Sequence, residues 1–144
     1  MDQGTFWESL NFSALKRLPI LFVCENNHLA IYSEQKKRTK TLDICKKVES
    51  FGVHTIKIED NSTKNIFKCA QKALQRIGKN YQPVFLEINT YREVDHVGIN
   101  YDFELGYRKK NKQKLLKSLY ELNSLKKKTK NFLQIEKKIK KEIY

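Results

Sequence analysis

The sequence has no long hydrophobic run, and glycine and proline are scarce, with 5 and 2 residues among 144. No apolar stretch approaches the roughly 20 residues that a membrane-spanning helix needs. Residues 1–4 are acidic and polar, where a signal peptide would be basic and then apolar. The 40% hydrophobic and 11% aromatic content can form a core and excludes collagen-like, mucin-like and fully disordered chains. We therefore expect a globular, cytoplasmic protein that does not associate with membranes.

Cysteine is scarce as well, and its spacing excludes the common cysteine-based sites. The three cysteines, Cys24, Cys45 and Cys69, are an odd number and form no C-x-x-C pair. No histidine flanks them at the spacing of a zinc site. We predict reduced, mostly buried thiols.

Acidic residues are scarce in only one part of the chain. Residues 1–107 contain 15 lysines and arginines against 13 acidic residues, whereas residues 108–144 contain 14 against 3. No aromatic platform or known nucleic-acid-binding motif accompanies these lysines, and solvated helix faces have the same composition. We predict a nearly neutral domain over residues 1–107 and a lysine-rich amphipathic helical tail over residues 108–144, without a nucleic-acid partner.

Apolar spacing predicts an α/β fold in the first segment. Helices are expected over residues 4–18, 42–50 and 63–78, the last with Ser62 as its N-cap. Strands are expected over residues 19–24, 54–58 and 83–88, and an exposed loop over residues 33–40. The alternation of strands and helices predicts a parallel sheet covered by helices, with the first strand buried on both faces. The tail is predicted to be one long or broken helix from its apolar residues Leu115, Leu119, Leu122, Leu125, Phe132, Ile135, Ile139 and Ile143.

Polar segments follow the first and third predicted strands, where parallel sheets gather ligands. Residues 25–28 read Glu-Asn-Asn-His, and an asparagine oxygen suits magnesium, although an asparagine pair is also typical of an ordinary turn. His96 has Asp95 beside it and is either a proton-transfer group or a surface loop histidine. His28 and His54 receive no predicted role.

These segments together resemble a known family. Residues 2–27, from Asp-Gln-Gly-Thr-Phe-Trp-Glu to Cys-Glu-Asn-Asn, resemble the alpha subunit of thiamine-diphosphate-dependent 2-oxo-acid dehydrogenases of the pyruvate and acetoin dehydrogenase type. The resemblance resumes at residues 83–92, Pro-Val-Phe-Leu-Glu-Ile-Asn-Thr-Tyr-Arg, and continues through residues 96–98 to 106–108. It implies decarboxylation of a 2-oxo acid with acyl transfer to lipoamide.

The resemblance also implies roles for individual residues and for partners. The Asn27 side chain and the Leu29 backbone carbonyl would be magnesium ligands that hold the diphosphate of thiamine diphosphate. His96 would be the active-site loop histidine that orients the substrate and the lipoyl group, with Tyr91 and Arg92 introducing its loop. A beta-type subunit in an alpha2-beta2 assembly and a lipoyl-bearing acyltransferase are the implied partners.

The sequence departs from the family pattern at several places. The Gly-Asp-Gly that opens the cofactor motif would fall immediately before Met1, so we expect only half of a thiamine-diphosphate-binding fold. Residues 93–95, Glu-Val-Asp, lack the second histidine of many members, and the lysine-rich tail replaces an Asp-Pro segment after Arg108. We therefore expect this chain to be inactive alone. The alternatives are a catalytically dead remnant that acts as a binding or scaffold subunit, and a basic nucleic-acid-binding protein.

Overall fold

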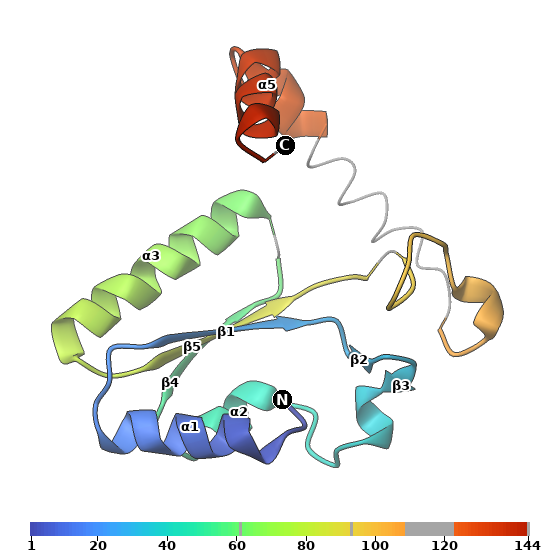
Figure 1. Ribbon diagram of the computed structural model, residues 1–144. Helices are drawn as coiled ribbons and strands as arrows, with labels where there is room; N and C mark the ends of the chain where they lie inside the picture. The colour runs from blue at the N-terminus through green and yellow to red at the C-terminus, as the bar shows by residue number, and fades with distance from the viewer. Residues whose placement is uncertain (61, 93, 109–122, 144) are drawn as a thin grey trace. The chain divides into compact units, whose positions relative to one another are not determined.

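The computed structural model describes residues 1–60, 62–92, 94–108 and 123–143. The chain divides into two compact units, Met1–Tyr107 and Arg108–Tyr144, each of which is described by itself. The first unit is an α/β fold in which helices cover both faces of a parallel three-stranded sheet (Figure 1). This architecture confirms the predicted fold class. None of the described helices is long and apolar enough to cross a membrane.

The sheet has the strand order β1-β5-β4, so the last strand in the sequence lies in the centre. Its strands are β1 (Leu21–Asn26), β4 (His54–Ile58) and β5 (Val84–Asn89), and all three run parallel. A short antiparallel pair, β2 (Leu29–Ala30) and β3 (Ser33–Glu34), follows β1. The expected loop over residues 33–40 therefore contains β3 and the 3-10 helix η1 (Gln35–Lys37).

The helices lie on opposite faces of the sheet. Figure 1 shows α1 (Gly4–Leu15) and α2 (Ile44–Glu49) below it and α3 (Thr63–Asn80) above it. Ser62 caps α3 as predicted, with its Oγ accepting from the Asn65 amide at 3.4 Å.

Two predicted helix ends were wrong. The first helix stops at Leu15 because Arg17 adopts φ 53° and the Leu18 amide donates to the Ser13 carbonyl, which is a Schellman end. The third helix continues past Gly78, and Tyr81 closes it in the left-handed conformation.

The central strand β5 carries the core. Phe85 is fully buried against the layer of α1 and α2 with Leu10 and Val48, whereas Leu86 packs with Ile58 on the α3 side. Burial of both faces was predicted for β1 and was wrong, because Val23 is 54% exposed. It is the central strand β5 that is buried on both faces. In the described part of the sheet β1 is an edge strand, and α3 contacts mainly β5 and β4.

The cysteines are free thiols, as predicted. Only Cys45 is buried, whereas Cys24 and Cys69 are partly exposed. Burial raises the pKa of the Cys45 thiol to about 12 and that of Cys24 to about 11. These thiols are therefore protonated and unreactive at neutral pH.

Most of the described residues of the second unit are helical. Residues 123–128 form one helix, Asn131 breaks it with φ 64°, and α5 (Phe132–Ile143) follows. The break agrees with the predicted broken helix, but Leu115, Leu119 and Leu122 lie outside the described residues. The apolar side chains of α5 are largely exposed, so this helix has no buried core of its own.

Candidate functional site

The carboxyl ends of β1 and β5 bring the two predicted polar segments together. Asn26 at the end of β1 lies opposite Asn89 at the end of β5. The Thr90 amide donates to the Asn26 carbonyl at 2.9 Å, so the loop after β5 starts beside the turn after β1. The sheet thus places both segments at one edge, as the parallel topology predicts.

Residues 26–29, here called the Asn turn, are shaped by two asparagine side chains. Asn26 Oδ1 accepts from the His28 amide at 2.9 Å, and Asn27 Oδ1 accepts from the Leu29 amide at 2.9 Å. These are overlapping Asx turns, and they hold His28 at φ 62°. An amide oxygen has two lone pairs, so Asn27 Oδ1 retains an acceptor position for a cation. The roles of Asn27 and Leu29 as magnesium ligands remain predictions.

His28 is a connecting residue that the sequence did not reveal. Its Nδ1 lies 3.0 Å from Gln35 Oε1, and its Nε2 lies 3.0 Å from Asn89 Oδ1. Gln35 in turn donates to the Leu42 carbonyl at 3.0 Å. The imidazole therefore joins the Asn turn to η1 and to the end of β5. No local pattern could have indicated this, because Asn89 is 61 residues away in the sequence.

Arg92 fastens the start of the loop after β5. Its guanidinium donates to the Ile31 carbonyl at 2.9 Å and pairs with the buried Asp102 carboxylate at 3.2 Å. The Tyr107 hydroxyl lies in the same cluster, and its ring contacts Tyr32 edge-on at 5.0 Å. The resemblance placed Arg92 at the beginning of this loop, and the structure gives it an anchoring contact there.

His96 lies on the exposed part of the same loop. The loop closes where the Asp95 amide donates to the Asn100 carbonyl at 2.9 Å, and its apolar tip residues Val97 and Ile99 are 84% and 89% exposed. The His96 side chain makes no hydrogen bond to another described residue. Its catalytic role therefore remains a prediction, as does any contact with the Asn turn.

A buried carboxylate, Glu87, lies on β5 below the Asn turn. It is 2% exposed, and it accepts from Asn26 Nδ2 at 2.8 Å and from the Cys45 thiol at 3.1 Å. Ligand atoms of Asp43, Cys45 and Glu87 lie within 4.8 Å of one another. After burial, the hydrogen bond to Glu87 is the next cause of the raised Cys45 pKa. Both carboxylate oxygens of Glu87 are already held by hydrogen bonds from Asn26 and Cys45, and we assign no metal to this group.

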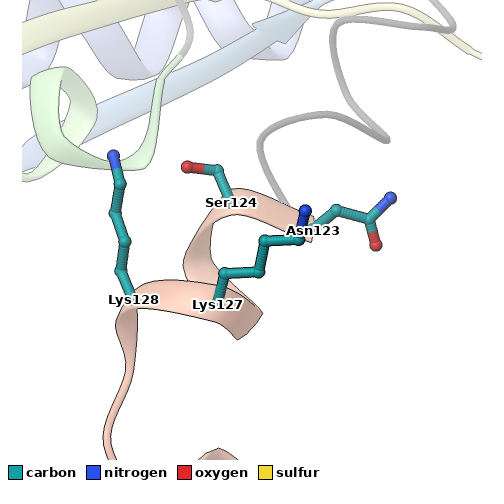
Figure 2. Close-up of a pocket in the computed structure, with 4 residues that line it drawn as sticks. All are labelled: Asn123, Ser124, Lys127 and Lys128. Carbon is teal, nitrogen blue, oxygen red and sulfur yellow. The ribbon is translucent and has the colours of Figure 1, made fainter.

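The second unit has a surface hollow of its own. Figure 2 shows its four lining residues, Asn123, Ser124, Lys127 and Lys128, on one short helical stretch. The hollow measures about 410 Å³. Since these residues offer neither a carboxylate nor an aromatic ring, we assign no catalytic function to the hollow.

Comparison of the sequence with known proteins assigns the chain to a family. The sequence model of the family described as "Dehydrogenase E1 component" matches residues 1–143. The chain belongs to this family. The pyruvate dehydrogenase E1 component subunit alpha of Porphyra purpurea is 35% identical to it over 95 residues. That of Rickettsia felis is 30% identical over 96 residues, and the 2-oxoisovalerate dehydrogenase subunit alpha of Bacillus subtilis is 28% identical over 95 residues.

These three alignments cover only part of each protein. They include 66% or 67% of the chain and 28% or 29% of the relative. The chain therefore spans less than a third of the length of the curated relatives it matches. The E1 family match confirms the resemblance and identifies the chain as alpha-subunit-like over that part.

Proposed function

We propose that the chain provides the segment of an E1-type 2-oxo-acid dehydrogenase alpha subunit that holds magnesium and the diphosphate of thiamine diphosphate. The observation that supports this proposal is the Asn turn, which lies at the carboxyl end of parallel strands in a chain of the E1 family. Members of this family use thiamine diphosphate. The remaining groups of the site would come from parts of the enzyme outside these 144 residues.

The residues of the Asn turn fit a magnesium ion in their chemistry. Asn27 offers a neutral amide oxygen and Leu29 a backbone carbonyl, and magnesium prefers about six oxygen ligands, some of them from phosphate. Bound thiamine diphosphate supplies stabilisation of the carbanion that decarboxylation leaves. The chain's part is to fix the two oxygens, which the Asx turns achieve without a charged ligand.

The loop after β5 would act on the substrate side of the site. Arg92 holds the base of this loop against Ile31 and Asp102, so the position of His96 depends on that anchor. His96 would orient the 2-oxo acid and the lipoyl group during acyl transfer. The enzyme would assemble as alpha2-beta2 with a beta-type subunit, receive a lipoyl-bearing acyltransferase and act in the cytoplasm.

Reconstitution with a beta-type subunit and the remainder of an alpha subunit tests the proposal. We expect Asn27→Ala to weaken magnesium-dependent binding of thiamine diphosphate by about tenfold or more, and His96→Ala to lower kcat with little change in that affinity. Asn11→Ala, at an exposed position of α1, is the control. Unchanged binding and turnover in both variants would remove these residues from the site.

The chain alone provides a second test. Because it offers two of the oxygens that magnesium needs, we expect isothermal titration calorimetry to detect no micromolar binding of magnesium and thiamine diphosphate. Micromolar binding by the isolated chain would contradict the incomplete site.

A further inference from the structure

The carboxylate of Glu87 is buried without a directly contacting cation; Lys57, its register partner on β4, interacts with it electrostatically. Glu87 lies on the central strand β5, is 2% exposed, and forms no ion pair with the described residues. Burying an unpaired carboxylate costs free energy, and its neighbours Phe85, Leu86 and Ile88 on the same strand are all apolar. The hydrogen bonds of Glu87 indicate which structural role offsets this cost.

Glu87 determines which end of the Asn26 amide points into the protein. A carboxylate only accepts hydrogen bonds, so the Asn26 group that faces it at 2.8 Å must be the Nδ2 donor. The Oδ1 atom then faces the His28 amide, which donates to it at 2.9 Å. If the Asn26 amide were flipped, its Oδ1 would face the Glu87 carboxylate and its Nδ2 would face the His28 amide. Two acceptors would then meet at one contact and two donors at the other, so both hydrogen bonds would be lost.

We propose that Glu87 is a positioning residue that holds the Asn turn in shape through Asn26. The inference about metal binding rests on the proposed function, because only that function makes the turn a magnesium site. The inference about the shape of the turn does not depend on it. Cys45, the other partner of Glu87 at 3.1 Å, lies on α2 and does not contact the turn through any described hydrogen bond.

Two variants of similar size distinguish the positioning role of Glu87 from an effect of its buried charge. Glu87→Gln and Glu87→Met both remove the charge, but only glutamine keeps an acceptor oxygen for Asn26 Nδ2. The measurement is amide hydrogen exchange of His28 in the 144-residue chain, relative to core amides of β5. We expect exchange to become about tenfold faster or more in Glu87→Met and to remain unchanged in Glu87→Gln and in the control Cys45→Ala. Equal exchange in Glu87→Gln and Glu87→Met would overturn the inference.

The wild-type chain gives a test that needs no folded variant. NMR of the Asn26 side-chain amide should show slow exchange of its Nδ2 protons, because the carboxylate binds them inside the protein. Free exchange of these protons would contradict the arrangement.

Cofactor binding in the reconstituted enzyme then connects Glu87 to function. With magnesium and thiamine diphosphate as the probe, we expect Glu87→Met to weaken calorimetric affinity about tenfold and Glu87→Gln to retain it. Absence of binding by the wild-type assembly would refute the proposed function, while the exchange data would still decide the role of Glu87. Wild-type affinity in Glu87→Met would overturn its positioning role for the metal.

Discussion

At the scale of single residues, the raised thiol pKa values predict low chemical reactivity. Burial raises the pKa of Cys24 from 9.0 to about 11 and that of Cys45 to about 12, so few thiolates exist at pH 8. We expect iodoacetamide to modify both thiols at least about tenfold more slowly in the folded chain than in urea. Mass spectrometry of each cysteine peptide measures the rates, and equal rates in the two states would contradict the assigned burial.

Two glycines predict opposite effects of the same substitution. Gly98 has φ 142°, and an added Cβ would lie 2.9 Å from both Asp95 carboxylate oxygens, so we expect Gly98→Ala to open the loop that carries His96. Gly78 lies within α3 with nothing near its Cβ position, so Gly78→Ala should stabilise the chain by about 0.5–1 kcal/mol. Amide exchange of Asp95 measures the effect of Gly98→Ala on the loop, and thermal unfolding measures the effect of Gly78→Ala on stability. Unaltered Asp95 exchange in Gly98→Ala would show that the loop does not need this glycine.

The candidate site could be predicted only in part from its residues. Asn27 and His96 could be found because each follows an apolar strand in a polar segment. His28 and Glu87 could not, because their partners Asn89 and Asn26 each lie 61 residues away from them in the sequence. A glutamate within an apolar strand also gives no sign of its burial until the order of the strands is known.

At the scale of elements, apolar runs and weak alternation located the three strands of the parallel sheet but not β2 and β3, and strand burial depended on topology. The runs at the start of β1 and in β5 are similarly apolar, yet β5 is central and β1 is an edge strand in the described sheet. Helix ends were also set by backbone geometry rather than by apolar spacing, as the Schellman end of α1 shows.

Neighbouring residues of β1 provide a test of this edge. Val23 is 54% exposed, whereas Phe22 packs into the cluster with Phe6 and Phe85. We expect Val23→Lys to change the free energy of unfolding by less than about 1 kcal/mol and to reduce self-association. Phe22→Lys should cost about 3 kcal/mol or more. Urea unfolding and light scattering measure these effects, and equal destabilisation by both variants would show that both faces of β1 are covered.

At the scale of the whole molecule, most of the net positive charge lies in a different part of the sequence from the candidate site. The first 107 residues carry a net charge of only +2, and they contain the Asn turn, the Arg92 anchor and the loop of His96. The remaining 37 residues carry +11, and the E1 family model extends over them as far as residue 143. The strong basic charge is therefore compatible with the enzyme family and does not require a nucleic-acid partner.

The most direct test transfers the first unit into an enzyme of the family. Residues 1–107 would replace the matching segment of the Bacillus subtilis 2-oxoisovalerate dehydrogenase subunit alpha, co-produced with its beta subunit. We predict that the assembled chimera binds thiamine diphosphate in a magnesium-dependent manner, and that Asn27→Ala weakens this binding by about tenfold or more. A chimera that folds and assembles but binds no thiamine diphosphate would contradict the proposed cofactor site.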